Sequence, residues 1–376
     1  MMQSRAQRHV PFAWPDIQDE DIAAVAAAVR DIGRADNRWI ERFEERLSQI
    51  TDSRHAIGVN SGTAALELAL RALGIGPGDE VILAALGYVA SANAICNAGA
   101  IPVFLDIEST GLNMDPDAIE AAVTPATRAL LVTHLFGIPA AIDRIMATAN
   151  RLGLTVIEDA CQALGTTSGG RAAGAIGRIG AFSFSSTKPT TAGEGGAVVT
   201  NDPALAQRLR ILRNQGRDPM QNDYVAVGSS ARMTELAAAL GWSQLGRLPS
   251  SLATRRYFAE RYRAALRGSA RIVLPEWNET AVVAWFGFPV RLAGVDAAAR
   301  DRILDALTEA GIEARAYFQP LHTCLAHRDR PQAGNLAHCE SAGRELLTLP
   351  LHGGMSQADV DRVAEMLMDA LRCRHR

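Results

Sequence analysis

The sequence predicts an α/β protein with a large domain built on a mainly parallel sheet and a smaller C-terminal α+β domain. From about residue 55 onward, short β-rich runs alternate with amphipathic helical stretches. Strands joined by helices of this length form βαβ units, whose strands run parallel. After about residue 250 this regular alternation stops. We therefore expect an N-terminal segment and large domain over 1–249 and a small domain over 250–376.

The large domain contains a series of predicted strands, most of them followed by a helix. The strands are expected at 55–59, 81–86, 101–105, 129–134, 154–159, 180–186 and 195–201. The helices are expected at 63–74, 88–97 and 141–153, with further helical sequence from about 203. A polar loop near 216–228 then leads to a long helical region over 234–266.

The C-terminal part has a different order of elements. Strands are expected within 270–277 and 281–292, and helices within 295–312 and 357–372. No fixed-period repeat, low-complexity tract or long linker interrupts the chain.

Composition excludes several classes of protein. The 376 residues are 48% apolar and 21% charged with a net charge of −3, so nothing favours nucleic-acid binding. No stretch of about 18 uninterrupted apolar residues predicts a membrane helix, and the first residues lack the apolar core of a secretory signal. The five cysteines are widely spaced without a CxxC pair, so neither disulfides nor a metal site are expected. We expect a cytoplasmic protein.

Lysine usage gives the first chemical indication. Lys188 is the only lysine among 38 basic residues, and the other 37 are arginine. An amine can lose its proton and attack a carbonyl to form a Schiff base, whereas a guanidinium stays protonated. Lys188 follows a strand-like run and precedes a Thr/Gly-rich turn, a position where open α/β sheets bind ligands. A stray surface lysine is the alternative, but pyridoxal 5'-phosphate (PLP) is the cofactor that most often needs such a residue.

A phosphate site for this cofactor is predicted at Asn60-Ser61-Gly62-Thr63. These residues follow a strand and open a helix, where free backbone N–H groups and the helix dipole favour an anion. Gly62 permits close approach and the Thr63 hydroxyl can donate. Ser183, shortly before the lysine, is a further hydroxyl donor. Simple helix capping by Ser61 or Thr63 is the alternative interpretation.

Asp159 is the candidate partner of the cofactor's ring nitrogen. It ends a predicted parallel strand, and a carboxylate there would keep the ring nitrogen protonated; an N-cap role is the alternative. Gln162 could hydrogen-bond the ring, and Tyr88 could stack on it or simply pack. His134, at another strand end, is more typical of a structural hydrogen-bonding residue.

The order of these features is more informative than any one of them. The chain presents a phosphate site, an aromatic residue, a carboxylate and a lysine at the ends of successive strands. Its motifs VNSGTAALELAL, YVASANAI, VIEDACQALG, FSFSSTKPTTAGEGGAVVTND and YFQPLH resemble those of the DegT/DnrJ/EryC1/StrS family of PLP-dependent sugar aminotransferases. The resemblance covers nearly the whole chain and implies the PLP-dependent transferase fold type I, as in aspartate aminotransferase.

The resemblance also implies roles for individual residues. Lys188 would form the Schiff base and Asp159 would bind the pyridine nitrogen, with Tyr88 stacked on the ring and Gln162 beside it. Contacts to the cofactor phosphate would come from Gly62, Thr63 and Ser183.

Two further implications concern the partner subunit and the substrates. The resemblance implies a homodimer with active sites at the interface, in which an asparagine from a segment like GYNYRM completes the phosphate site of the partner subunit. In this chain residues 228–233 are GSSARM. Ser230 therefore replaces the asparagine, and Ala231 replaces the aromatic residue. An amino-acid donor, L-glutamate, would aminate a nucleotide-linked 4-keto-6-deoxy sugar in amino-sugar, surface-polysaccharide or natural-product biosynthesis. His322 and Arg232 are candidate substrate contacts.

Three alternatives to transamination stay open at this point. One is a PLP-dependent sugar dehydratase or epimerase-like enzyme, although relatives with dehydratase activity replace the lysine with histidine. Another is a catalytically silent paralogue that binds a sugar nucleotide. A nicotinamide-dependent enzyme is disfavoured because no GxGxxG follows the first strand.

Overall fold

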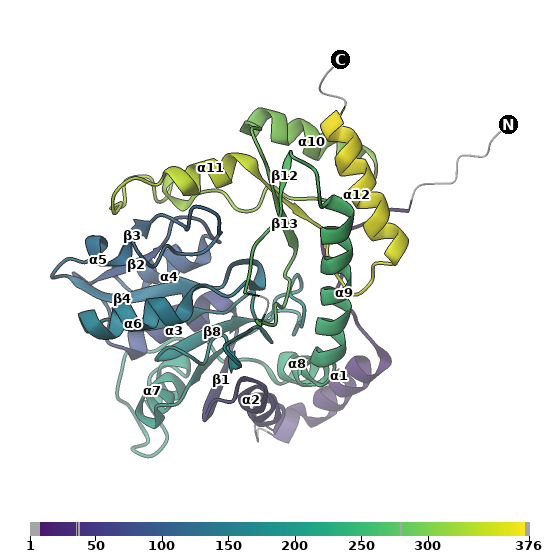
Figure 1. Ribbon diagram of the computed structural model, residues 1–376. Coiled ribbons are helices and arrows are strands. Elements are labelled where there is room, and N and C mark those ends of the chain that lie inside the picture. The colour runs from purple at the N-terminus through teal and green to yellow at the C-terminus, as the bar shows by residue number, and fades with distance from the viewer. Residues whose placement is uncertain (1–7, 35, 37, 279, 373–376) are drawn as a thin grey trace.

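The computed structural model describes residues 8–34, 36, 38–278 and 280–372. Its centre is a seven-stranded sheet with the strand order β1-β9-β8-β5-β4-β2-β3 (Figure 1). The strands are β1 (His55–Val59), β2 (Glu80–Ala84), β3 (Ile101–Leu105), β4 (Thr127–Thr133), β5 (Thr155–Asp159), β8 (Ile179–Ser183) and β9 (Gly196–Thr200). Only β9 is antiparallel to its neighbours, β1 and β8. The predicted α/β fold with a mainly parallel sheet is confirmed.

The sheet is covered on both faces. In β1, β2, β3 and β5 every residue after the first is buried. Because successive side chains of a strand point to opposite faces, burial at consecutive positions requires a layer on each side. The helices that follow the strands are α3 (Gly62–Ala72), α4 (Ala90–Asn97), α5 (Ile119–Ala122), α6 (Ile142–Leu152) and α7 (Pro203–Arg213).

The N-terminal helices pack against the middle of the chain. Helices α1 (Asp19–Asp31) and α2 (Arg38–Thr51) both contact α8 (Glu235–Gly246). The long helical region predicted over 234–266 is two helices, because the chain turns at Arg247 before α9 (Leu248–Leu266). The predicted domain boundary at 249/250 falls in the first turn of α9, and it stays a prediction.

The C-terminal part contains a second, antiparallel sheet. It has the strand order β12 (Ile272–Val273), β13 (Phe288–Leu292) and β14 (Leu346–Leu349). Helices α10 (Ala297–Glu309), α11 (Ala337–Glu345) and α12 (Gln357–Arg372) accompany it, and α12 packs on α9 (Figure 1). The remaining elements are the short strands β6 (Thr167–Ser168), β7 (Arg171–Ala172), β10 (Arg217–Asp218) and β11 (Asp223–Tyr224) and three 3-10 turns, η1 (Ile32–Arg34), η2 (Leu135–Gly137) and η3 (Leu321–Thr323).

The strand predicted over 281–292 is wrong in its first half. Only Phe288–Leu292 is a strand, because Trp285 has a left-handed backbone with φ 51°. The backbone groups around it bond outside the sheet: the Phe286 N–H donates to the Phe136 carbonyl at 2.9 Å, and the Trp285 carbonyl accepts from Arg255 at 2.7 Å. Similarly, only Ile272–Val273 of 270–277 forms a strand.

No helix within the described ranges is long and apolar enough to cross a membrane.

Candidate functional site

Asp159 lies at the carboxyl end of β5 and is held by two hydrogen bonds. The Ser91 hydroxyl donates to one carboxylate oxygen at 2.6 Å, and the Cys161 backbone N–H donates to the other at 3.1 Å. Asp159 and Ser91 are both buried, so water does not compete for these bonds. The Cys161 bond closes a local turn rather than capping a helix, because no helix follows directly. Hydrogen bonds to the ionised form stabilise a carboxylate in this place.

Sequence reasoning missed Ser91. It lies in α4, three residues after Tyr88, whose carbonyl accepts from the Ser91 N–H at 3.3 Å. The only signal is a serine on a helix face whose other buried residues are apolar, because a buried hydroxyl needs a partner.

Lys188 follows β8, the neighbour of β5 in the sheet. Burial lowers the pKa of the Lys188 amine below its usual value. Electrostatic interactions with Cys161, Asp159 and Glu194 pull the pKa back up without restoring it. The structure therefore places the predicted amine and carboxylate close enough to interact electrostatically. The lowered pKa favours the neutral, nucleophilic form of the amine.

The predicted phosphate site lies between α3 and the end of β8. Ser61 caps α3 by accepting from the Ala64 N–H at 3.1 Å, as the alternative interpretation held. Capping leaves the N–H groups of Gly62 and Thr63 without a hydrogen bond to any residue that the structure describes. A Cβ on Gly62 would lie 2.8 Å from the Cβ and 3.1 Å from the Oγ of Ser183. The bare glycine, the free N–H groups and the Ser183 hydroxyl together fit a phosphate group.

Gln162 and Tyr88 present the surfaces expected for a planar ring. The Gln162 side-chain oxygen accepts from the Phe136 N–H at 2.8 Å, which leaves the amide nitrogen as the end that can donate. Tyr88 is 57% exposed although large and aromatic, and its ring meets Phe318 edge-on at 6.2 Å. The residues present therefore fit PLP.

Comparison with known proteins identifies the family. A family model described as the DegT/DnrJ/EryC1/StrS aminotransferase family matches residues 15–368. The chain belongs to this family. It is 39% identical over 336 residues to the GDP-perosamine synthase of Caulobacter vibrioides, covering 89% of this chain and 90% of that one. It is 38% identical to the dTDP-3-amino-3,4,6-trideoxy-alpha-D-glucose transaminase of Streptomyces venezuelae, covering 99% and 98%.

Solved structures show the same fold. A protein from Streptococcus pneumoniae that is named as a sugar aminotransferase was solved in its pyridoxamine 5'-phosphate (PMP) form. It superimposes with a TM-score of 0.92 at 29% identity, covering 98% of this chain and 100% of that one. The same protein in its PLP form gives a TM-score of 0.92 at 30% identity, covering 97% and 99%. The chain is therefore a PLP-dependent aminotransferase of fold type I.

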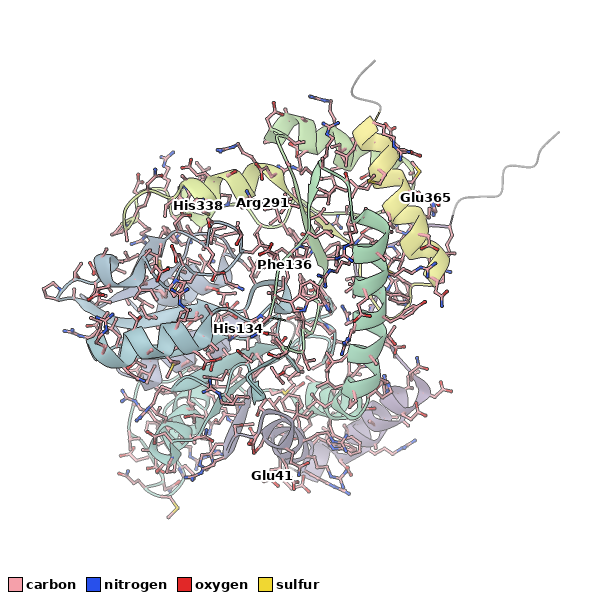
Figure 2. The ribbon with its side chains drawn as sticks, in the orientation of Figure 1. Glu41, His134, Phe136, Arg291, His338 and Glu365 are labelled. Carbon is pink, nitrogen blue, oxygen red and sulfur yellow. The ribbon has the colours of Figure 1, made fainter. Side chains whose placement is uncertain are left out.

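His134 of the aminotransferase is fully occupied by structural bonds. Its Nε2 lies 2.9 Å from the Glu158 carboxylate, and its Nδ1 accepts from the Ala140 N–H at 3.1 Å. Both side chains are completely buried, and Figure 2 shows His134 below Phe136 in the middle of the molecule. His134 is therefore a structural residue, as its position in the sequence favoured.

Glu158 anchors two loops of the aminotransferase beside the site. Besides His134, it accepts the backbone N–H groups of Gly174 at 2.8 Å, Ile176 at 2.7 Å and Gly177 at 2.5 Å. Burial acts to raise the pKa of Glu158, but the bonds from His134 and the backbone outweigh it and hold the pKa below its usual value.

The aminotransferase places the remaining predicted residues outside this cluster. Ser230 is exposed and lies beside the phosphate segment, where Asn60 Nδ2 donates to its carbonyl at 3.4 Å. Arg232 is exposed and donates to Asn214 at 2.7 Å and to the Ser230 hydroxyl at 3.4 Å. His322 is buried, with Nε2 3.3 Å from Glu340 and Nδ1 unpartnered. Their roles toward substrate or a second subunit stay predictions.

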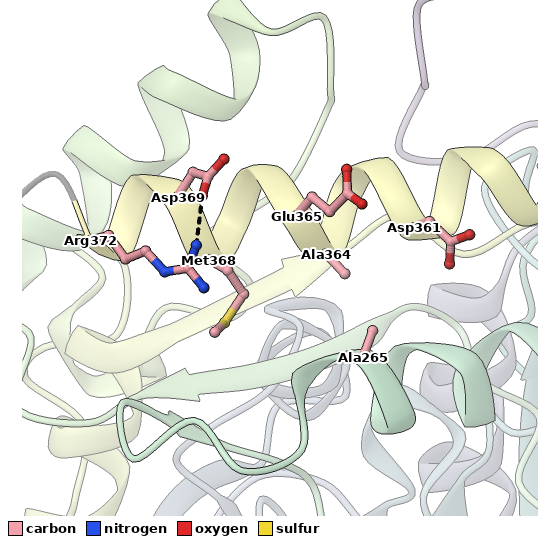
Figure 3. A pocket seen from close by; sticks show the side chains of 7 residues that line it. All are labelled: Ala265, Asp361, Ala364, Glu365, Met368, Asp369 and Arg372. Atoms are coloured by element: carbon pink, nitrogen blue, oxygen red, sulfur yellow. Dashed lines mark hydrogen bonds and ion pairs between the residues drawn. The ribbon is translucent and has the colours of Figure 1, made fainter.

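A separate pocket between α9 and α12 is not the site. It measures about 360 Å³ and is lined by Ala265, Asp361, Ala364, Glu365, Met368, Asp369 and Arg372 (Figure 3). None of these residues belongs to the cluster around Asp159 and Lys188.

Proposed function

We propose that this aminotransferase moves an amino group from an amino acid, L-glutamate, to a nucleotide-linked 4-keto-6-deoxy sugar. The observation that carries the proposal is the meeting of the Lys188 amine, the Asp159 carboxylate and the Gly62–Ser183 phosphate site at one edge of the sheet. The names of the two relatives at 39% and 38% identity, a GDP-sugar synthase and a dTDP-sugar transaminase, support a nucleotide-linked acceptor.

In this proposal the residues of the site divide the work of holding the cofactor. The N–H groups of Gly62 and Thr63 and the hydroxyl of Ser183 bind the phosphate, while Gln162 and Tyr88 orient the ring. Asp159, kept in place by Ser91, binds the ring nitrogen in its protonated form. PLP held in this way supplies an electron-withdrawing ring that accepts the electron pair left when a proton leaves the donor's α-carbon.

Lys188 is the proton carrier. Its Nζ takes the proton from the donor's α-carbon and delivers it to the aldehyde carbon of the cofactor. For the sugar, the same atom carries out these two transfers in reverse. Burial lowers the pKa of this amine, so more of it is neutral and able to accept the proton. His134 cannot replace it, because its two ring nitrogens are engaged by Glu158 and Ala140.

We also propose that the enzyme works as a homodimer with Ser230 near the partner's phosphate site. Large apolar side chains lie exposed on α1 and on the loop after α7: Ile22 61%, Val29 54%, Met220 87%, Tyr224 68% and Val227 87%. Exposed apolar groups of this kind are typical of an interface.

Sedimentation should give twice the chain mass of 40.1 kDa, and Val29→Asp combined with Val227→Asp should shift the protein to the single-chain mass. A wild-type monomer would contradict the proposal. The predicted cytoplasmic location stays a prediction.

The deciding experiment is reduction of the PLP-loaded protein with borohydride, followed by peptide mapping. Because the chain has one lysine, a side-chain adduct must map to Lys188. Lys188→Arg keeps a positive charge but removes the nucleophile, so the adduct and turnover should both disappear. Normal turnover in Lys188→Arg would overturn the proposed mechanism.

The acceptor is tested by mixing the PMP form with a panel of nucleotide-linked keto sugars. Amino transfer should regenerate the PLP form and yield an amino sugar. A dehydratase would release a deoxygenated sugar instead, and a silent paralogue would bind a sugar nucleotide without any change in the cofactor.

A further inference from the structure

The Lys188 amine lies against an aromatic ring contributed by a distant part of the chain. Its Nζ is 4.5 Å from the ring centroid of Phe286, within the range of a cation–π contact of about 6 Å. Phe286 is buried and precedes β13 of the small sheet, whereas Lys188 follows β8 of the large one.

Hydrogen bonds fix the backbone on which this ring is carried. The Phe286 N–H donates to the Phe136 carbonyl at 2.9 Å, and the Phe136 N–H donates to Gln162 at 2.8 Å. Phe136, which has a left-handed backbone with φ 57°, therefore links Phe286 to Gln162, a predicted cofactor contact. On the other side, the buried Arg255 guanidinium donates to the carbonyl of Trp285 at 2.7 Å.

The turn beneath Phe286 is closely packed, and only a glycine fits at position 137. Gly137 has φ 83°, and a Cβ there would lie 2.9 Å from both the Trp285 nitrogen and the Gln162 carbonyl oxygen. The Phe286 ring also meets Phe12 edge-on at 6.2 Å. These contacts position the Phe286 ring beside the Lys188 amine.

A ring face and an aliphatic cover differ in their effect on an amine. Both exclude water, which disfavours the charged form, but only the ring face attracts the cation. The other ionisable groups that act on the amine are Cys161, Asp159 and Glu194. They belong to the part of the chain that forms the large sheet and favour the cation from there, whereas Phe286 precedes β13 of the small sheet.

We propose that Phe286 is a positioning residue that holds the Lys188 amine against its ring face whenever this amine carries its extra proton and is not covalently joined to the cofactor. The ring gives the released amine a defined resting place beside the reacting centre. The proposal rests on Lys188 being the cofactor lysine, as argued above.

The single lysine makes a direct test possible. Full-length protein labelled with ¹³C,¹⁵N-lysine gives one side-chain signal, and its Hε protons should be shifted upfield by the ring, relative to the same sample unfolded in denaturant. In Phe286→Leu this shift should vanish. The titration midpoint of the amine should fall by about one unit, as expected for loss of a desolvated cation–π contact.

Two further variants control for repacking. Phe286→Tyr keeps the ring face and should retain the upfield shift and the midpoint. Phe12→Leu removes a neighbour of Phe286 that does not contact the amine, and should leave both nearly unchanged. The same spectra with PMP added test the resting place in a cofactor-loaded form.

A wild-type lysine signal without a ring-current shift would overturn the proposal, whether or not Phe286→Leu folds. An unchanged shift and midpoint in folded Phe286→Leu would do the same. Borohydride trapping at Lys188 is independent of these spectra. Trapping without a ring-current shift would therefore refute this inference alone, whereas failure of trapping would refute the proposed function.

Discussion

Removal of the Ser91 hydroxyl should slow amino transfer without weakening substrate binding. Ser91→Ala deletes the donor that lies 2.6 Å from one oxygen of Asp159 and leaves the Cys161 N–H, which donates to the other oxygen at 3.1 Å. Ser91 is 3% and Asp159 5% exposed, so bulk water does not take the vacated position. Asp159 would keep its place in the fold but lose the hydroxyl that donates to its carboxylate.

The size of the effect follows from the strength of that bond. A hydrogen bond to a charged group contributes about 1.5–3 kcal/mol, and each 1.36 kcal/mol is a factor of ten in rate. If the loss is expressed wholly in the step that Asp159 assists, the rate of the half-reaction falls about 10- to 150-fold. The Michaelis constant for the amino-acid donor should stay within about twofold, because Ser91 bonds Asp159 and not the substrate.

The assay is stopped-flow absorbance of the donor half-reaction, with circular dichroism to confirm folding. Ser91→Thr keeps a hydroxyl and should restore most of the rate. Ser243→Ala is the matched control, because Ser243 is a buried serine that hydrogen-bonds another carboxylate, Asp21. A wild-type rate in Ser91→Ala, or an equal loss in Ser243→Ala, would refute the reasoning.

Two further substitutions test the phosphate site and the buried anchor. Gly62→Ala places a methyl group 2.8 Å from the Ser183 Cβ, so PLP affinity measured by fluorescence titration should fall at least tenfold; Gly33→Ala, with nothing within 4 Å, should bind normally. Glu158→Gln should lower the free energy of unfolding in urea by about 3–5 kcal/mol, whereas Glu120→Gln, at an exposed ion pair with Arg151, should change it far less. Since the pKa of Glu158 is lowered on folding, this difference should hold at neutral pH and shrink as the pH falls below about 4.5; a constant difference down to pH 3 would contradict it.

Much of the site could be predicted because its residues lie at strand ends. Parallel strands end at one edge of a sheet, so a carboxylate after one strand and a lysine after its neighbour must meet there. The hydrophobic pattern around Asp159 and Lys188 was enough to predict these two positions. A glycine that directly follows a predicted strand and opens a helix similarly marks the start of α3, where the N–H groups of Gly62 and Thr63 are left free.

The parts that could not be predicted depend on contacts between distant segments. Ser91 acts on Asp159 across 68 positions of sequence, and no local pattern marks that partnership. The strand predicted over 281–292 was wrong for the same reason. Its apolar residues have strand propensity, but the buried Arg255 and the Phe136 carbonyl bind the backbone of Trp285 and Phe286 and stabilise a turn. Tertiary hydrogen bonds outweigh local propensity at this point.

Arg255 also gives a physical reason why structural positive charges in this chain are arginines. Its guanidinium is buried and donates to the carbonyls of Trp285 and Leu351, each at 2.7 Å. Burial lowers the pKa of Arg255 from 12.5 to about 10, so it stays charged at neutral pH. The same desolvation applied to a lysine, whose ordinary pKa is lower than that of arginine, would leave less of the side chain charged and weaken the charge that holds the turn beneath Phe286. A guanidinium therefore suits the residue that supports the site, and an amine suits Lys188, where a proton has to leave and return.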